Sequence, residues 1–594
     1  MYRSPGLSLL LCAAVGVLLS SAPATAQAHR SPPAPRSGGT TAQTSSSGRS
    51  TGTEALVPVV ASNTPVAGRH VSADRILEIA EALARMRAVR AGYPGSFADA
   101  YLNGPSRWQV SFFSHDGKKE IGQVILGETS AGARVLEQWT GFQIAWTMAR
   151  GYPGAFGRHV NALYVWLPLC VLFILPFLNF RRPFSLLHLD LLVLLSFSLS
   201  LAFFNHGHIY ASVPLAYPPL LYLLARMLAL ARRGRRGEIG PLRLLVPVRW
   251  LALGVIFLLG FRIALNVTDS NVIDVGYAGV IGAQRIVDDK PLYGSYPSDN
   301  EHGDTYGPVN YEAYVPFEQV FGWSGSWDDL PAAHGAAIAF DLLAAGLLFL
   351  LGRRVRGPAL GVALAYAWAA YPFTLFALES NSNDALVAVL VLAAMLAASY
   401  TTDAGVAARG AFTALAGLTK FAPLALAPLF ATHGLRTQRP SRRLRSLALF
   451  AAAFAGTAAL VSIPALRHDS LHEIYERTIV YQANRGSPFS VWGLYGGLGG
   501  LQLAVQLAAV ALAVALALLP RRPDLIGLAA SCAAVIVAMQ LGIDHWFYLY
   551  IPWFFPLVMI ALLGRFSSPQ PRPAVAVASI PARWSRRAAA ASSG

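Results

Sequence analysis

The sequence predicts an all-α polytopic membrane protein with about eleven transmembrane helices and a re-entrant helical hairpin, preceded by a small α+β domain. Of the 594 residues, 54% are hydrophobic and only 13% are charged, a composition that excludes a soluble protein. Apolar segments of transmembrane length recur after residue 157, and short arginine runs separate them, as in cytoplasmic loops. Because the net charge of +16 comes mainly from these runs, we expect no nucleic-acid partner.

The first part of the chain predicts a targeting segment and a linker. Residues 1–28 combine a positive Arg3, an apolar core and small residues at a cleavage site, which is typical of a secretory signal peptide. An uncleaved anchor is the alternative, and it gives the same topology. Residues 29–69 are rich in Ser, Thr, Gly, Pro and Ala, so we expect a disordered linker.

Residues 70–156 predict a small α+β domain on the extracytoplasmic side. The stretch SADRILEIAEALARMRAVRAG has an N-cap residue, helical apolar spacing and a closing Gly. WQVSFFS and EIGQVILGE flank an Asp-Gly turn and predict a hairpin. AGARVLEQWTGFQIAWTMARG predicts a second helix that leads toward the membrane. In its order of helix and strands the domain resembles PepSY-like domains, and it carries no catalytic constellation.

The membrane part divides into three N-terminal helices in residues 157–248, a core in residues 249–565 and a basic cytoplasmic tail in residues 566–594. The expected crossings are residues 160–180, 184–204, 211–231, 249–267, 332–352, 357–377, 384–400, 444–464, 496–519, 524–543 and 546–564. This arrangement places the arginine runs inside and residues 70–156 outside. Residues 406–432 have cytoplasmic flanks at both ends and a break around residues 417–423, which predicts a re-entrant hairpin of two short helices.

The polar loop at residues 267–331 is the most informative part of the sequence. It holds eleven carboxylates against two basic side chains, and it is rich in Tyr, Trp, Gly and Pro. A simple tether would not need so many acids and aromatic rings close to a membrane. The first candidates for chemistry are Asp274, Asp288, Asp289, Asp304 and Glu312. Each acid taken alone also fits a solvated loop charge.

Charged residues inside apolar segments are the next signal. Lys420 lies in the broken segment, where a lysine needs a partner or an anionic ligand. One alternative is that it reaches an interface or pairs with a helix acid; the other is that its ammonium meets a lipid phosphate. Arg262 and Asp341 flank the acidic loop, and we expect them to pair with each other.

Three other polar segments join the acidic loop on the outer face: the substantial segment at residues 468–490 and two tight turns. Glu379 and Asp384 bracket the Asn-rich turn ESNSND, where Asp384 could also cap the following helix. Arg485 lies in the segment at residues 468–490, and His545 follows Asp544 in GIDHW. A single His at a membrane interface is more often structural than catalytic.

Sequence signals for cofactors are weak. The chain has no Walker loop, dinucleotide fingerprint or HExxH pattern. Adjacent acids in a loop are weak evidence for a metal, and the three cysteines lie in apolar stretches. We therefore expect neither a metal nor another cofactor.

The acidic loop and two later segments together resemble the multispanning GT-C glycosyltransferases, most closely family 87, the polyprenyl-phosphate-sugar-dependent, mannosyltransferase-like group. The matching loop phrases are IDVGYAGVIGAQRIVDDKPLYG, which contains Asp274, and TYGPVNYEAYVPFE, which contains Tyr306. ALAGLTKFAPLALAP resembles the helix break of the family and includes Lys420, and HWFYLYIPWFFPLV resembles its closing helix. The resemblance covers residues 249–564. Asp289 and Lys290 stand where Gly is more usual.

The resemblance implies transfer of a mannose-like hexose from a polyprenyl-phosphate-sugar donor to an extracytoplasmic glycan or lipid acceptor. Asp274 would be the general base. Lys420, together with Arg485, would stabilise the departing phosphate. The remaining expected substrate-binding residues are Tyr306, Glu379, Asp384 and His545. Such enzymes generally need no metal.

Two other functions are compatible with the sequence. Broken helices and buried charges suit a transporter or flippase of lipid-linked sugars, and the outer domain suits a membrane-anchored sensor. The large acidic loop favours the enzyme. All three functions place the protein in the cell membrane as a multi-pass protein.

Overall fold

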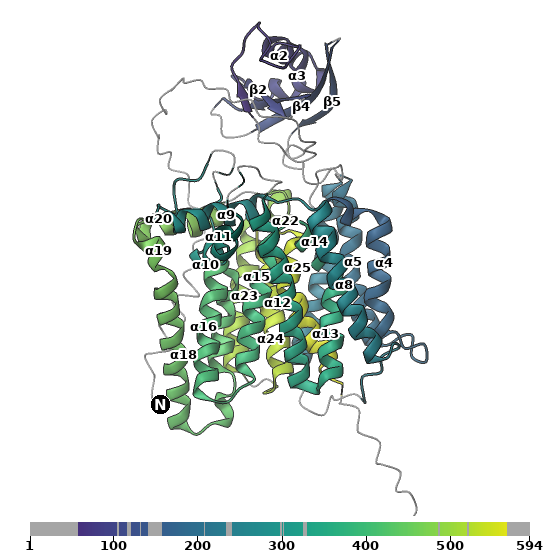
Figure 1. Cartoon of the computed structure of the whole chain (residues 1–594), viewed down its shortest axis with the longest axis vertical. Helices are drawn as coiled ribbons and strands as arrows, with labels where there is room; N and C mark the ends of the chain where they lie inside the picture. Colours follow the sequence, from purple (N-terminus) through teal and green to yellow (C-terminus); the bar gives the residue numbers. More distant parts are fainter. Residues whose placement is uncertain are drawn as a thin grey trace, which may run out of the picture.

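The computed structural model describes residues 57–103, 106–115, 120–130, 132–140, 157–206, 208–232, 240–297, 300, 302–322, 324, 330–484, 487–519 and 522–566. Figure 1 shows a small sheet domain and a bundle of helices, with the sheet domain beyond the end of the bundle that carries α9, α11 and α20. Each part has its own buried hydrophobic cluster. The expected signal peptide, most of the linker and the tail after Phe566 lie outside the described residues.

The N-terminal domain is a five-stranded antiparallel sheet whose strands follow one another in sequence order. Its elements are β1 (Val57–Val59), α2 (Ala73–Glu81), α3 (Ala84–Ala91), β2 (Phe97–Asn103), β3 (Arg107–Phe113), β4 (Glu120–Thr129) and β5 (Gly132–Thr140). The Ser72 hydroxyl accepts a hydrogen bond from the backbone N–H of Arg75 and caps α2. The β3–β4 pair confirms the predicted hairpin.

Two features of this domain differ from the sequence expectations. Residues 132–140 form strand β5, whereas the sequence predicted the start of a second helix. The apolar residues of this stretch pair along the edge of β4, where Val135 packs against the core, so the tertiary context outweighs a short helical pattern. The sheet also begins earlier than expected, because β1 lies within the residues assigned to the linker and pairs with β2.

The bundle contains two groups of helices. The N-terminal group is η2 (Arg158–Asn161), α4 (Leu163–Ile174), η3 (Leu175–Phe177), α5 (Leu186–Asn205), α6 (Ile209–Leu215) and α7 (Tyr217–Arg232). The core group is α8 (Val248–Asp269), α12 (Pro331–Arg356), α13 (Pro358–Ala370), α14 (Pro372–Glu379), α15 (Asp384–Ala398), α16 (Asp403–Thr419), η6 (Ala422–Leu426), α17 (Ala427–Thr432), η7 (Leu435–Thr437), α18 (Pro440–Val461), α19 (Ile463–Leu466), α23 (Gly499–Leu518), α24 (Leu525–Gly542), η9 (Tyr548–Tyr550) and α25 (Ile551–Leu563).

Short helices lie across one end of this bundle (Figure 1). They are α9 (Asp274–Val287), α10 (Pro308–Glu312) and α11 (Val315–Phe321) from the acidic loop, and α20 (Leu471–Tyr475), η8 (Glu476–Val480), α21 (Tyr481–Asn484) and α22 (Val491–Leu494) from a later segment. The segment η8 is a π-helical turn.

Several helices are long and apolar enough to cross a membrane. Among the described residues there are seven, or eight if α13 and α14 count as one span bent by 57°. Three shorter apolar helices accompany them, at Leu163–Phe177, Asp384–Ala398 and Tyr548–Leu563. The protein is therefore a multi-pass membrane protein, and the expected count of eleven crossings is not confirmed. The bend follows from Pro372, which lacks the N–H needed to continue α13 and holds Tyr371 in an extended conformation.

The broken segment forms a hairpin with unequal legs. The first leg is the long helix α16, and the second is the short pair η6 and α17, where the sequence predicted two short helices. Both ends of the hairpin lie together, because Arg409 donates a hydrogen bond to the backbone carbonyl of His433 (3.3 Å). Asp403 at the start of α16 also pairs with Arg445 near the start of α18 (2.5 Å).

The arginine runs share the end of the bundle opposite the acidic loop. Arg354 bonds to Ser399, and Arg442 donates to the carbonyl of Thr401. Arg436 donates to the carbonyl of Leu518 at the end of α23. These contacts join the loops that the sequence assigned to the cytoplasm.

The chain enters the bundle at the acidic-loop end. The backbone N–H of Gly157 donates to the Asn271 side chain (2.9 Å), and the His159 ring lies 2.6 Å from the Asp269 carboxylate. Residues 157–161 and the start of the acidic loop are therefore on one side.

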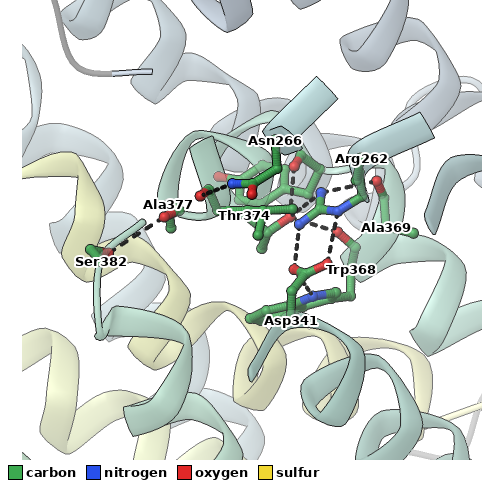
Figure 2. Close-up of polar contacts among 10 residues, drawn as sticks. Arg262, Asn266, Asp341, Trp368, Ala369, Thr374, Ala377 and Ser382 are labelled. Carbon is green, nitrogen blue, oxygen red and sulfur yellow. Dashed lines mark hydrogen bonds and ion pairs between the residues drawn. The ribbon is translucent and has the colours of Figure 1, made fainter. Parts of the chain in front are cut away.

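Arg262 and Asp341 form the expected pair inside the bundle. Arg262 Nε donates to Asp341 (3.0 Å), and its Nη1 reaches the carbonyl of Ala369 and the hydroxyl of Thr374. Trp368 Nε1 also donates to Asp341 (2.8 Å). Figure 2 shows these contacts, which link α8, α12, α13 and the bent helix α14. A second buried pair, Asp190 and Arg226, joins α5 to α7 and was not predicted from the sequence.

Candidate functional site

A cavity of about 270 Å³ opens at the end of the bundle that carries the acidic loop. Its walls come from the acidic loop, the turn of the hairpin, the helical segment η8–α21, α23, α24, the chain between α24 and α25, and the start of α25. The polar residues on the walls are Thr305, Tyr306, Lys420, Gln482, Gln502, Gln506, Gln540, Asp544, His545, Tyr550 and Trp553. Apolar side chains such as Ile479, Ile536 and Met539 line the rest.

Lys420 lies on the cavity wall at the turn of the hairpin. Helix α16 ends at Thr419, and Lys420 is extended with φ −139° and ψ 137°. Its side chain is 9% exposed, and Nζ donates to Asp384 Oδ1 at 2.6 Å. The structure thus confirms the pairing with a helix acid, and it also leaves the lysine on the cavity surface.

Three aromatic rings surround the ammonium of Lys420. Nζ lies 5.5 Å from the ring centroids of Tyr306 and Tyr550, and 5.2 Å from that of Trp553. At these distances the ring faces attract a cation. The ammonium is therefore fixed in direction by one carboxylate and three rings.

The acidic loop reaches this lysine through a close backbone contact. A Cβ atom on Gly307 would lie 2.0 Å from the Leu418 carbonyl oxygen, so only glycine fits where the loop crosses the end of α16. This contact explains why Gly follows Tyr306, and it holds the Tyr306 ring against Lys420.

Asp384 is the first residue of α15 and is fully buried. Its Oδ1 accepts hydrogen bonds from Lys420 and from Trp553 Nε1 (2.9 Å). The capping alternative is wrong, because Asn383 is the N-cap and no side chain caps this helix. Asp384 instead positions Lys420 and Trp553.

Asp274 begins α9 and is exposed, away from the lining of the Lys420 cavity. Its surroundings are nevertheless fixed. The backbone N–H of Ile273 donates to the carbonyl of Ser380 (3.2 Å), and the Asn300 side chain donates to the carbonyl of Asp274 (3.0 Å).

The turn between α14 and α15 is built around Asn381. Its φ of 47° lies in the left-handed region, which Asn tolerates better than most residues. Its amide donates to the Ser270 hydroxyl and the Asn271 carbonyl and accepts from Asn266, each at 2.9 Å. The turn is thereby tied to the end of α8.

The other expected binding residues divide between cavity and core. Tyr306 and His545 line the cavity, and the His545 ring contacts the Ser487 hydroxyl at 2.8 Å. Glu379 is fully buried at the end of α14, away from the lining, and neither carboxylate oxygen has a hydrogen-bond partner among the described residues. Arg485 lies outside the described residues.

Asp544 is a further site residue that was not predicted from the sequence. It is the carboxylate on the cavity lining, and it accepts a hydrogen bond from Gln502 at 2.9 Å. Burial raises the pKa of Asp544, although the bond from Gln502 opposes this shift. The polar phrase GIDHW could have indicated Asp544, because it places this carboxylate next to His545 between two apolar segments.

Two acids of the long loop behave as solvated charges. Asp288 is exposed and pairs with Lys290 (2.8 Å). Asp289 is also exposed and lies 3.0 Å from the His468 ring, a hydrogen bond that lowers the pKa of Asp289.

The other two acids are more enclosed. Asp304 is fully buried, and burial raises its pKa although the backbone N–H of Gly294 bonds to it. Burial raises the pKa of Glu312 to about 7. Within the described ranges, no group of three or more His, Cys, Asp or Glu residues is arranged to hold a metal ion.

Comparison with known families covers much of this site. Residues 305–542 match the model described as Glycosyltransferase family 87. This segment belongs to glycosyltransferase family 87. The family 87 segment contains Tyr306, Asp384 and Lys420, whereas Asp274 lies well before its start and His545 lies just after its end. No curated protein matches the chain. The protein is therefore a membrane glycosyltransferase, which acts on a sugar donor and an acceptor.

Proposed function

We propose that the protein transfers a mannose-like hexose from a polyprenyl-phosphate-linked donor to a glycan or lipid acceptor on the extracytoplasmic face of the cell membrane. The observation that supports this most directly is the fixed ammonium of Lys420 on a partly apolar cavity. A cation suits the phosphate of the donor, and the apolar wall at Ile479, Ile536 and Met539 suits its lipid chain.

In the proposed reaction an acceptor hydroxyl attacks the anomeric carbon of the donor sugar. Asp274 takes the hydroxyl proton as the new C–O bond forms. The bond from the anomeric carbon to the phosphate oxygen breaks, and its electron pair leaves with the polyprenyl phosphate. Lys420 then stabilises the charge that develops on this phosphate.

Each remaining site residue has a proposed part. Asp384 positions Lys420, and Tyr306 and His545 contact the donor where they line the cavity. Arg485 is proposed as a second phosphate ligand because Gln482 and Ala483, just before it in sequence, line the same cavity. Glu379 supports the turn before α15 from within the core.

The location of the acidic loop supports Asp274 as the base. Asn300 holds the backbone of Asp274, and Thr305 and Tyr306 of the same stretch line the cavity. Asp544 is the competing assignment because it lies on the lining itself.

Purified protein and a panel of polyprenyl-phosphate hexoses test this proposal, with mass detection of the product. Asp274→Asn keeps the size of the side chain and removes the base, so the turnover rate should fall by about 10²–10⁴-fold with donor affinity little changed. Asp544→Asn should keep most of the turnover, and Asp288→Asn is the matched control from the exposed part of the loop. Full turnover in Asp274→Asn would contradict the assignment of Asp274 as the base. Loss of turnover in Asp544→Asn alone would assign the base to Asp544 instead.

A further inference from the structure

A second cavity, of about 250 Å³, adjoins the Lys420 cavity. His302, Asp304 and Thr305 of the acidic loop form one wall, and Glu476, Arg477 and Tyr481 form the other. Thr305 lines both cavities.

One helical segment separates the two cavities. Glu476, Arg477 and Tyr481 face the second cavity, whereas Ile479 and Gln482 face the Lys420 cavity. The segment includes the π-helical turn Glu476–Val480, a widened helix that is frequent at functional sites. The two cavities nevertheless meet at Thr305, so a ligand in the second cavity would lie beside the donor.

Asp304 gives the second cavity an unsatisfied acceptor. Its side chain is 1% exposed, and Oδ2 accepts a hydrogen bond from the backbone N–H of Gly294 (2.7 Å) and lies 3.7 Å from Arg477 Nη1. Oδ1 is buried and has no hydrogen-bond partner among the described residues. Leaving a buried carboxylate oxygen without a donor is costly. A ligand hydroxyl would satisfy it.

The remaining lining suits a neutral sugar. Arg477 and the Thr305 hydroxyl add hydrogen-bond donors, and Glu476 adds a further acceptor. The rings of His302 and Tyr481 lie 4.6 Å apart at 31° and offer an apolar surface to the C–H face of a pyranose. Two carboxylates against one guanidinium disfavour a phosphate or another anion.

We infer that the second cavity binds the acceptor sugar, a neutral pyranose whose hydroxyls bond to Asp304, Glu476 and Arg477. This inference rests on the proposed function. The stretch at residues 300–306 connects its parts: Asn300 holds the backbone of Asp274, Asp304 lies in the acceptor cavity, and Tyr306 packs on Lys420. One short piece of chain thus contributes residues to both cavities and holds the backbone of the proposed base.

The test measures acceptor and donor separately on the full chain in nanodiscs. Binding of methyl hexosides is followed by saturation-transfer NMR, and transfer is followed with a polyprenyl-phosphate hexose. Asp304→Asn keeps the acceptor for Gly294 and converts the free oxygen into a donor. We expect the acceptor KM to rise about tenfold or more, which corresponds to one hydrogen bond to a charged group. Donor affinity and the slow transfer of the sugar to water should stay within twofold.

Two further variants keep the test decisive. Asp288→Asn, an exposed acid of the same loop paired with Lys290, should change none of these quantities. Tyr481→Ala removes one ring from the half-buried edge of the cavity and should weaken methyl hexoside binding even if Asp304→Asn does not fold. Loss of hexoside binding in either cavity variant supports the inference whether or not a polyprenyl-phosphate donor is used. An unchanged acceptor KM with unchanged hexoside binding overturns it, and a loss of donor affinity in Asp304→Asn assigns the cavity to the donor instead.

Discussion

Lys420 and Asp384 each carry a charge that would be costly to bury alone, and each neutralises the charge of the other. The ammonium is 9% exposed and the carboxylate 1% exposed, and their atoms meet at 2.6 Å. Removing one partner of such a pair leaves a buried charge, whereas replacing both with neutral groups of similar shape costs far less. In the proposed reaction this pair both stabilises the core and binds the donor phosphate, so stability and binding must be measured together.

Lys420→Met should destabilise the protein by about 3–5 kcal/mol, because Asp384 is left without its counter-charge. The double variant Lys420→Met with Asp384→Asn should recover most of that stability, since Asn still accepts from Trp553. Donor-lipid affinity should fall in both variants. The measurements are thermal unfolding and donor binding on the same preparations.

The exposed pair Lys290 and Asp288 provides the matched control. Its neutralisation should change the unfolding free energy by less than about 1 kcal/mol. If the double variant bound donor lipid as tightly as the wild type, Lys420 would be purely structural.

Glu312 should make stability depend on pH. Burial raises the pKa of Glu312 in the folded protein to about 7, whereas an unfolded Glu titrates near about 4.3. The folded state therefore binds the proton more tightly, and this contribution to stability is complete below the unfolded pKa and lost as pH rises through about 7. Between pH 5 and 8 the midpoint of thermal unfolding should fall more for the wild type than for Glu312→Gln. Parallel curves for the two proteins would contradict this assignment.

At the scale of elements, the sequence predicted well wherever one local signal decided the structure. The cap at Ser72, the β3–β4 hairpin and the break at Lys420 each follow from a few adjacent residues. Strand β5 could not be predicted in this way, because its conformation depends on the open edge of β4. The uneven legs of the hairpin likewise depend on packing between α16 and α18 that no local pattern encodes.

The candidate site was predictable only residue by residue. Lys420, Tyr306 and His545 were singled out by sequence and do line one cavity. Their grouping, and the share of Asp544 in it, depends on contacts between segments more than a hundred residues apart. Glu379 was also predicted to bind substrate because it lies in a polar turn of the sequence, but its side chain is buried in the core.

For the whole molecule, the two ends of the bundle differ in charge. The arginine runs bond to neighbouring loops and helix ends at one end, and the acidic loop occupies the other. Since cytoplasmic loops are enriched in Lys and Arg, we predict that the acidic loop and the N-terminal domain lie outside.

Labelling of single cysteines with an impermeant maleimide tests this orientation, after replacement of Cys12, Cys170 and Cys532. Ser114→Cys in the N-terminal domain and Gln319→Cys in the acidic loop should react in intact cells. Ser441→Cys, at the start of α18, should react only after the membrane is permeabilised. Reaction of Ser441→Cys alone in intact cells would mean that the orientation is inverted.

The turn at Asn381 has a consequence for how the sequence can drift. Glycine would accept a φ of 47° but would remove all three amide hydrogen bonds, and most other side chains would add about 1–2 kcal/mol of backbone strain. Aspartate would introduce another acid near the buried Glu379. Almost every single substitution of Asn381 is therefore expected to destabilise the protein. Asn381 can be replaced without this loss only after its hydrogen-bond partners at the end of α8 have been replaced. This turn therefore constrains the order of substitutions as well as their identity.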